Sequence, residues 1–315
     1  MKAVIAGTGR YLPEKKLSNE EISKMVDTSD EWIKQRVGIN SRHIAAGHET
    51  TTYMAIEAAK DTLKSANMEF SQIDLVIVAT STADDKMPST AVKVQGALGP
   101  SKCMSFDVSA ACSGFIYAMD VAFNYIKAGT SKNVLIIGVE SMSRVVDWTD
   151  RSTCVLFGDG AGAVILQAQH DSGQGGSGII SSKMYTDGSY RDLLYIEEAK
   201  SLSMEGNKVF KHAVTYLSNA VEDLVDSIDG LSSGDIDWLI PHQANYRIIA
   251  AAANKLKLPM EKVILTLPEH GNTSSASVPL ALDVAVKSKK VKKGDLLLLE
   301  AFGSGFVWGA ILVRF

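Results

Sequence analysis

The sequence predicts an α/β fold built from two related halves. Short apolar runs alternate with helical patterns along the 315 residues, which is typical of an α/β architecture with a largely parallel sheet. Residues 73–77, Ile-Asp-Leu-Val-Ile, recur 163 positions later as 236–240, Ile-Asp-Trp-Leu-Ile. Asp-Val-Ala at 120–122 recurs at 283–285 with the same offset, and the apolar run 134–137 recurs at 296–299 with an offset of 162. A near-constant offset indicates a duplicated unit.

The predicted elements follow in chain order from these patterns. Short apolar runs predict strands at 3–6, 75–79, 104–108, 134–139, 162–167, 238–240, 263–266, 296–301 and 310–313. Helical patterns between them predict helices at 20–25, 51–66, 113–127, 209–227, 245–255 and 275–287. The order helix, strand, long loop, helix, strand is the same in both halves. We therefore expect one half at 1–171 and the other at 172–315, joined around the polar, glycine-rich stretch 172–178, with a site at their seam.

Composition excludes several classes of protein. The chain is 46% hydrophobic and 22% charged, as in soluble globular proteins. Its net charge of −4 argues against a nucleic-acid partner held by bulk charge. Three cysteines, an odd count without paired spacing, indicate a reducing compartment. The N-terminus lacks the pattern of a signal peptide and no stretch approaches 18 apolar residues, so we expect a cytoplasmic protein without a membrane span.

Cys112 is a candidate nucleophile. The segment 110–115, Ala-Ala-Cys-Ser-Gly-Phe, lies where the strand 104–108 gives way to the helix 113–127. Unsatisfied N–H groups and the helix dipole at such a position favour the thiolate and can lower a cysteine pKa to roughly 3.5–7.5. The small neighbours of Cys112 leave room for a substrate. A buried structural cysteine is the alternative.

Two loops of the second half supply candidate partners for Cys112. His242 lies in Pro-His-Gln-Ala-Asn at 241–245, and Asn272 lies in His-Gly-Asn-Thr-Ser at 270–274. All three residues are in loops that follow strands, where the sites of open α/β sheets lie. His242 is favoured as the functional histidine, and His270, close to Asn272, is the alternative.

Cysteine, histidine and asparagine can support two chemistries. Papain-like proteases have the same chain order and a similar spacing, but their local Cys-Gly-Ser/Ala-Cys-Trp/Tyr signature does not match the run around Cys112. The other chemistry is carbon–carbon bond formation on an acyl thioester.

Five motifs in this order resemble the β-ketoacyl-acyl carrier protein synthase III family. They are Thr-Ser-Asp-Glu-Trp-Ile-Lys-Gln-Arg-Val-Gly-Ile at 28–39, the segments 110–115, 241–245 and 270–274, and Phe-Gly-Ser-Gly-Phe at 302–306. The resemblance spans nearly the whole chain. It implies the thiolase-like fold, with five layers in the order αβαβα from two duplicated α/β halves, and a homodimer.

The resemblance implies a decarboxylative Claisen condensation. Cys112 would accept the acyl group of an acyl-CoA primer, with acetyl-CoA the default, in a ping-pong reaction. Malonyl-acyl carrier protein would then lose CO₂, while neutral His242 and the Asn272 carboxamide stabilise the enolate. Backbone N–H groups of Cys112 and Ser304 would hold the later oxyanion, and Ser304 stands where the family usually carries glycine. The product would be a 3-oxoacyl-acyl carrier protein, as in the first elongation step of bacterial-type fatty acid synthesis. No metal and no cofactor are expected, because acyl-CoA is a substrate.

The resemblance also implies binding residues. Trp32 and Arg151 would sandwich the adenine of CoA, with Arg36 and Thr28 near its phosphates and ribose. Met87 of the partner subunit would close the primer pocket. An acidic carrier protein needs a local basic patch, expected at Gln243, Ala244, Asn245, Tyr246, Arg247, Lys211 and Lys255.

Two readings of the same fold stay open. One is a polyketide-type or quinolone-type synthase with another primer or extender, and the other is a non-catalytic paralogue that binds acyl groups. The glycines at 7–9 and 157–162 are interpreted as packing or turn glycines, because neither run has the strand–loop–helix context of a dinucleotide site.

Overall fold

The first half of the chain forms a five-stranded mixed sheet. The computed structural model describes residues 1–170, 176–197 and 201–315. The sheet has the order β1-β7-β6-β4-β5. β4 pairs in parallel with β5 and β6, whereas β7 is antiparallel to β6 and β1. Its strands are β1 (Lys2–Tyr11), β4 (Leu75–Ala79), β5 (Met104–Val108), β6 (Asn133–Ser141) and β7 (Asp159–Gln169).

The second half repeats four of these strands. Its sheet has the order β11-β12-β13-β8, with the first pair parallel and the other two antiparallel. The series β4-β6-β7-β1 has the same order and directions, which confirms the predicted duplication. The strands are β8 (Gly178–Thr186), β11 (Trp238–Pro241), β12 (Leu296–Gly303) and β13 (Val307–Arg314). The expected boundary between the halves, at 171/172, lies outside the described residues.

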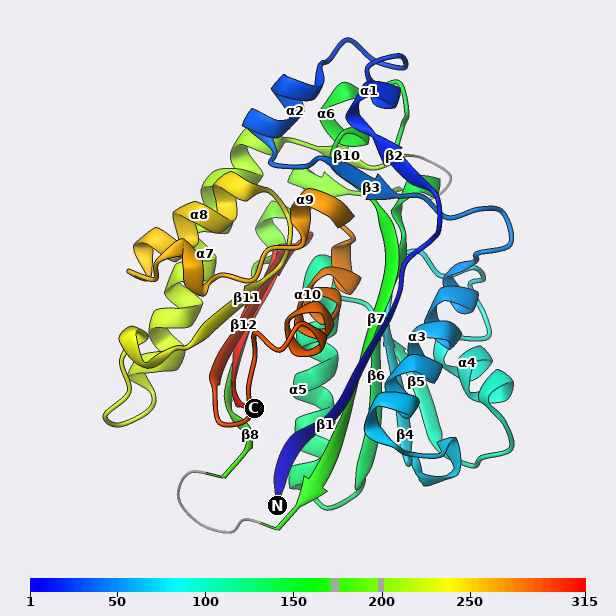
Figure 1. The fold of residues 1–315 in the computed structure, drawn as a ribbon, viewed down its shortest axis with the longest axis vertical. Helices are drawn as coiled ribbons and strands as arrows, with labels where there is room; N and C mark the ends of the chain where they lie inside the picture. The colour runs from blue at the N-terminus through cyan, green and yellow to red at the C-terminus, as the bar shows by residue number, and fades with distance from the viewer. Residues whose placement is uncertain (171–175, 198–200) are drawn as a thin grey trace.

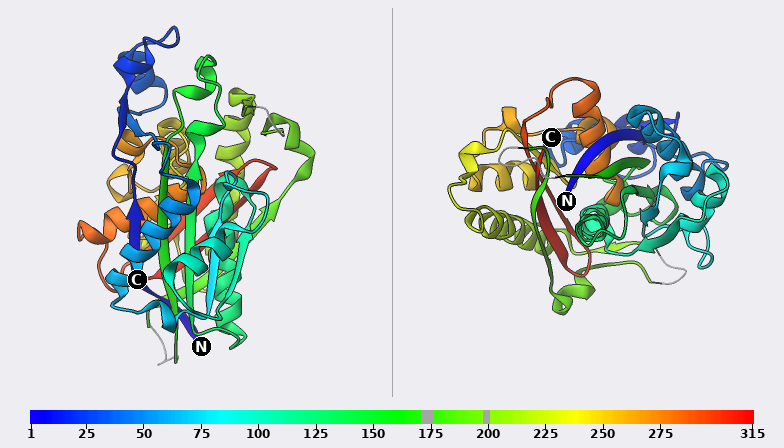
Figure 2. Two further views of the ribbon diagram at one scale, coloured as in Figure 1. Left: turned by 90° about the vertical axis from the view of Figure 1, so that its right-hand side faces the viewer. Right: turned by 90° about the horizontal axis from the view of Figure 1, so that it is seen from below.

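Six longer helices complete five layers (Figures 1 and 2). α5 (Gly114–Lys127) and α10 (Ser277–Lys287) lie between the sheets and share one apolar core with both of them. α3 (Thr51–Ala66) and α4 (Thr90–Leu98) cover the outer face of the first sheet. α7 (Gly206–Asp226) and α8 (Tyr246–Lys255) cover that of the second. The arrangement confirms the predicted αβαβα fold.

The central position of α10 explains its sequence. Eight of the eleven residues of this helix are buried, because sheets flank it on two sides. Even Asp283 is inaccessible, and it accepts a 2.8 Å hydrogen bond from Thr8 and pairs with Arg10 at 2.9 Å. A charged side chain in such a layer has to be paired, since an isolated buried charge is costly. Asp283 thereby joins the second half to β1.

Short elements gather at one end of the sheets, at the top of Figure 1, and carry Trp32 and Arg151. These two residues lie on α2 and α6. The short elements of the chain are α1 (Asn19–Ile22), α2 (Asp30–Arg36), α6 (Arg151–Cys154), α9 (Leu267–His270), β2 (Lys16–Ser18), β3 (Ser41–His43), β9 (Leu194–Tyr195) and β10 (Ser203–Met204).

The structure corrects four details of the prediction. The sheets are mixed and not largely parallel, since β1, β7, β8 and β13 form antiparallel pairs. The expected strand at 263–266 is reduced to a single bridge between Val263 and Leu239. β8, α2 and α4 were not expected. The expected helix at 20–25 ends earlier, at Ile22.

No helix in the described part of the chain has the length and apolarity needed to cross a bilayer.

Candidate active site

Cys112 lies in a tight turn between β5 and α5. Residues Ala111–Ser113 form a 3-10 turn, and Ala111 has the left-handed φ of +46°. The turn is held to β13 by the Ser113 hydroxyl, which donates to the Val307 carbonyl at 2.9 Å. Gly303 closes over it, because a Cβ atom at this position would lie 2.8 Å from the backbone nitrogen of Cys112. Only glycine allows β12 to approach the nucleophile turn so closely.

Burial opposes ionisation of the Cys112 side chain. Burial raises the pKa of this thiol to about 11, the Ser274 side chain acts in the opposite direction, and the charge of Glu140 adds to the rise. The helix terminus favours the thiolate, whereas burial, the largest cause of the shift, acts in the other direction. Cys112 lies in the 3-10 turn that leads directly into α5.

His242 is held neutral behind the end of β11. Its backbone N–H donates to the Glu300 carbonyl at 2.8 Å, and its Nδ1 atom lies 2.6 Å from the Ser277 hydroxyl. That hydroxyl accepts the Gln243 N–H at 3.3 Å, which favours donation of its own proton to Nδ1. Burial lowers the pKa of His242 to about 3. The ring is therefore neutral near pH 7, and this arrangement favours the tautomer with Nε2 protonated.

Asn272 is fixed through both its backbone and its side chain. Its backbone N–H donates to the Leu156 carbonyl at 2.9 Å, and its carbonyl accepts the Gly158 N–H at 3.0 Å. Its Oδ1 atom accepts the Ser274 N–H at 2.9 Å. With Oδ1 held in this way, the carboxamide is oriented by the protein before any ligand arrives.

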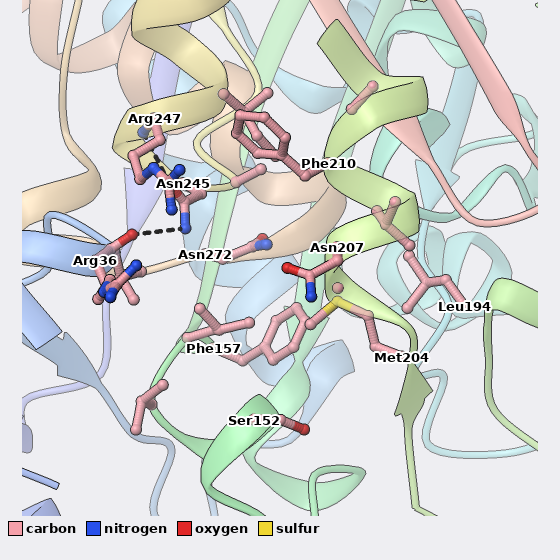
Figure 3. Close-up of a pocket in the computed structure, with 18 of the residues that line it drawn as sticks. Arg36, Ser152, Phe157, Leu194, Met204, Asn207, Phe210, Asn245, Arg247 and Asn272 are labelled. Carbon is pink, nitrogen blue, oxygen red and sulfur yellow. Dashed lines mark hydrogen bonds between the residues drawn. The ribbon is translucent and has the colours of Figure 1, made fainter.

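The three predicted catalytic residues meet at one cavity of about 530 Å³. A second cavity of about 350 Å³ also reaches Cys112, and Ser304 and Ser274 line it. His270 lines neither of these cavities, and its ring packs edge-on against His43 at 5.9 Å. The geometry therefore favours His242 over the alternative histidine. Figure 3 shows the larger cavity with Phe157, Asn207, Asn245 and Asn272 around it.

Three of the four predicted CoA residues reach the larger cavity. Trp32, Arg36 and Arg151 line it. The guanidinium carbon of Arg151 lies 4.3 Å from the Trp32 ring centroid, and its Nη1 donates to the Asp27 carbonyl at 2.7 Å. Thr28 is not among the lining residues.

The predicted carrier-protein residues divide into three groups. Ala244, Asn245 and Arg247 line the larger cavity, and Figure 3 shows Arg247 beside Phe210, whose ring centroid is 5.3 Å from the guanidinium carbon. The other residues that are exposed lie outside this cavity, and they are Tyr246, Lys211 and Lys255.

Gln243 is misassigned as a docking residue. Its side chain is inaccessible, donates to the carbonyls of Pro241 and Ile264, and accepts the N–H groups of Thr266 and Leu267. These bonds satisfy the whole carboxamide, so Gln243 braces the loop that carries His242. Met87 is 84% exposed and lines neither of the two cavities in its own chain.

Several residues of the site escaped the sequence analysis. Ser274 and Ser277 lie within or next to a quoted motif, but only the fold shows their bonds to Asn272 and His242. Glu140 is distant in sequence from every motif and reaches the site through Ser274. Asn207 and Phe210 belong to α7. Phe210 falls within the expected helix 209–227 and Asn207 just before it, and no motif marked either residue. Within the residues that the structure describes, no cluster of three or more His, Cys, Asp or Glu is arranged to hold a metal ion.

Comparison with known proteins identifies the family. The model of 3-oxoacyl-(acyl-carrier-protein) synthase III matches residues 106–188, and the model of its C-terminal part matches residues 227–315. A β-ketoacyl-(acyl-carrier-protein) synthase III of Rhodospirillum centenum is 51% identical over 321 residues, with 100% of this chain and 99% of the relative covered. The corresponding protein of Xanthomonas campestris is 52% identical, with 99% and 98% covered.

Solved structures agree with this similarity. The 3-oxoacyl-(acyl-carrier-protein) synthase III of Aquifex aeolicus has a TM-score of 0.96 at 48% identity, over 99% of this chain and 100% of that one. A priming β-ketosynthase of a polyketide pathway has a TM-score of 0.92 at 35% identity, over 99% and 96%. From its motifs, its fold and these relatives, the chain belongs to the 3-oxoacyl-(acyl-carrier-protein) synthase III family.

Proposed function

We propose that this protein joins an acyl-CoA primer to malonyl-acyl carrier protein by decarboxylative condensation. The products are 3-oxoacyl-acyl carrier protein, CoA and CO₂, and the reaction starts fatty acid synthesis. The observation that supports this most directly is the convergence of Cys112, His242 and Asn272 on one cavity. Family membership at about half identity over the whole chain supports the same reaction.

In the first half-reaction Cys112 takes the acyl group. Its sulfur attacks the thioester carbonyl, the carbon–sulfur bond to CoA breaks, and CoA leaves as a thiol after receiving a proton. Because the resting thiol has a pKa of about 11, deprotonation accompanies the attack. The covalent intermediate gives ping-pong kinetics.

In the second half-reaction the malonyl group loses CO₂. The electron pair of the broken carbon–carbon bond forms an enolate, whose oxygen needs hydrogen-bond donors. The Nε2–H group of neutral His242 and the Asn272 carboxamide supply two donors, each worth about 10²–10³ in rate. A neutral imidazole can donate a hydrogen bond from Nε2–H without transferring its proton. Burial keeps the His242 ring neutral.

The enolate carbon then attacks the acyl thioester of Cys112. The oxyanion of the tetrahedral intermediate would accept hydrogen bonds from the N–H groups of Cys112 and Ser304. Its carbon–sulfur bond to Cys112 then breaks, 3-oxoacyl-acyl carrier protein is released, and the sulfur takes a proton from solvent to become a thiol again. The position of Gly303 against the Cys112 nitrogen supports this assignment, because it brings the 303–305 loop to the nucleophile turn. Ser304 keeps the backbone donor that glycine would supply.

The two substrates use the mouth of the larger cavity. Trp32 and Arg151 bind the adenine of CoA once the Arg151 guanidinium, now 4.3 Å from the Trp32 ring centroid, moves away from that ring. Arg36 and Thr28 lie near the phosphates and ribose. Arg247 is the main contact residue of the carrier-protein surface. The other residues of this surface are Ala244, Asn245, Tyr246, Lys211 and Lys255. Their place beside the cavity, or on the exposed helices α7 and α8 next to it, supports this surface.

The protein works as a homodimer in which Met87 reaches the primer pocket of its partner. The exposure of Met87 and of Met104 on the edge strand β5 supports an interface there. The 350 Å³ cavity next to Cys112 has room for an acetyl primer, the default substrate. The reaction needs no resident cofactor, and three free cysteines fit a cytoplasmic setting.

Mass spectrometry tests this function. Incubation with acetyl-CoA should add one acetyl group, Cys112→Ser should remove the adduct, and malonyl-acyl carrier protein should then discharge it as 3-oxobutyryl-acyl carrier protein. A protein that gains no adduct from acetyl-CoA or longer acyl-CoAs contradicts the proposal. A polyketide-type synthase would instead prefer another primer or extender. This alternative is less favoured, because the priming β-ketosynthase of the polyketide pathway is only 35% identical to this chain.

A further inference from the structure

Glu140 is a buried carboxylate whose hydrogen bonds link the first half of the chain to the second. It lies near the end of β6 and is inaccessible to solvent. Its two oxygens accept the Ser81 N–H at 3.2 and 3.1 Å, and Oε2 accepts the Thr82 hydroxyl at 2.6 Å. The Thr82 hydroxyl in turn accepts the Ser141 N–H at 2.8 Å, so its own proton is free for Glu140. These donors hold the carboxylate within the first half.

The Thr80 hydroxyl donates a longer bond to Oε2 at 3.4 Å, and Glu140 also accepts a bond from Ser274 of the second half. The Ser274 hydroxyl donates to Oε1 at 3.1 Å, and the backbone N–H of the same residue donates to Oδ1 of Asn272 at 2.9 Å. Ser274 has a left-handed φ of +49° and is buried. A residue other than glycine keeps that conformation only where its surroundings impose it. The bond to Glu140 is one such constraint.

We propose that Glu140 is a positioning residue for decarboxylation, acting through Ser274 on the orientation of Asn272. The inference rests on the function proposed above, because it assigns the effect to the enolate-forming step. Glu140 does not need to touch substrate. It fixes Ser274, whose backbone N–H group donates to Oδ1 of Asn272. The carboxamide nitrogen of Asn272 is thereby oriented toward the enolate.

The acyl-loading step should not depend on this link. Loading needs the sulfur of Cys112, and the charge of Glu140 raises the pKa of that thiol. Loss of the carboxylate therefore favours the thiolate, so it should leave loading no slower than in the unmodified protein. In Glu140→Ala the two half-reactions thus separate a positioning role from general damage. Ser274→Ala also removes a hydroxyl that lowers the pKa of the Cys112 thiol, so for that variant the rate of CO₂ release is the informative measurement.

The experiment measures both half-reactions in Ser274→Ala and Glu140→Ala. Loading is followed as the acetyl adduct formed from acetyl-CoA, and decarboxylation as CO₂ released from malonyl-acyl carrier protein without primer. Both variants should release CO₂ about 10- to 100-fold more slowly, since small misplacements cost up to about 10² in rate. Thr273→Val is the matched control, because the Thr273 hydroxyl is buried in the same turn without a partner among the described residues.

The conservative variant Glu140→Gln should retain most activity, because its amide can donate to the Ser274 hydroxyl while its oxygen still accepts from Ser81 and Thr82. The double variant should be no slower than the slower single one, as expected for residues that act together. Decarboxylation at the normal rate in Ser274→Ala, equal losses of both half-reactions in Glu140→Ala, or a Gln variant as slow as the Ala variant would each overturn the inference. An unmodified protein inactive in both assays would instead contradict the proposed function.

Discussion

The hydroxyl of Ser277 lies 2.6 Å from Nδ1 of His242, and the same oxygen accepts the N–H of Gln243 at 3.3 Å. The first residue of α10 therefore orients a ring at the end of β11. The tautomer that donates from Nε2 depends on this bond.

Substitution of Ser277 by Ala should slow decarboxylation of malonyl-acyl carrier protein about 10-fold. The variant loses one hydrogen bond to the ring, which is worth about 0.5–1.5 kcal/mol. Acetyl loading on Cys112 should be unchanged. Ser288→Ala, at the other end of α10, is the control for loss of a serine hydroxyl, because its bond is to the Ala285 carbonyl. Equal rates in the two variants would exclude a role of Ser277 in orienting the ring.

Replacement of Asn272 by Asp should slow decarboxylation by about 10²–10³. Aspartate keeps an oxygen for the Ser274 N–H but places a second oxygen where the donor stood, and a carboxylate repels the enolate. Acetyl loading should continue, which the mass of the acyl-enzyme reports. An unchanged rate of CO₂ release would remove Asn272 from the mechanism.

Arg151→Ala should raise the KM for acetyl-CoA about 10-fold, since stacking of a cation on an aromatic face contributes up to roughly 2 kcal/mol. Decarboxylation of malonyl-acyl carrier protein without primer should not change. Arg191, which is 80% exposed, provides the control variant Arg191→Ala. A similar rise in KM in the control would show a general effect of lost charge.

Arg247→Glu should raise the KM for malonyl-acyl carrier protein about 10-fold and leave acetyl loading intact. Arg247 lines the cavity and stacks on Phe210, whereas Lys255 donates to Asn219 away from the cavity. Lys255→Glu should therefore have a smaller effect, and the difference should shrink at high salt. Equal losses of both half-reactions in Arg247→Glu would contradict a docking role.

Glu300 should make stability fall as pH rises. It is buried on β12, its carboxyl oxygens have no partner among the described residues, and burial raises its pKa to about 8. The folded protein then binds a proton that the unfolded chain has already lost. The contribution is fully present below the unfolded pKa of about 4.3 and is lost as pH rises through about 8, at roughly 1 kcal/mol per pH unit between these values.

Thermal unfolding from pH 6 to pH 9 checks this. Glu300→Gln should show a smaller fall in Tm than the unmodified protein, because the amide does not ionise. Glu20→Gln, on exposed α1, should behave like the unmodified protein. Parallel curves for all three proteins would show that Glu300 ionises freely in the folded state.

Internal repetition carried most of the fold prediction. The offset between residues 73–77 and 236–240 placed β4 and β11 in equivalent positions, and the sheets confirm this. Strand direction was not accessible, because an apolar run reads the same in parallel and antiparallel pairs. β8 was missed since it is an edge strand, with a half-exposed sequence that lacks a continuous apolar run.

The convergence of Cys112 and His242 followed from their places after strands. Asn272 was expected to follow a strand at 263–266 but follows α9, so its place in the site came from the motif 270–274. The chemical state of these residues did not follow from the sequence. The pKa of the Cys112 thiol depends on burial by distant segments, which the helix terminus does not report. Gln243 shows the same limit: His242, Ala244 and Asn245 of the same motif line the cavity, but backbone groups of Pro241 and of the segment 264–267 enclose the carboxamide of Gln243.

The two cavities meet at Cys112, Phe157 and Leu194. An acyl group stored in the smaller one leaves the larger one empty, so CoA and the carrier protein's arm would occupy the same space at different times. Acyl-CoA would then compete with malonyl-acyl carrier protein for the acyl-enzyme. Malonyl-acyl carrier protein would likewise compete with acyl-CoA for the free enzyme. A high concentration of either acyl-CoA or malonyl-acyl carrier protein should therefore inhibit the overall reaction. The ratio of the two substrates would then set the rate at which new chains begin.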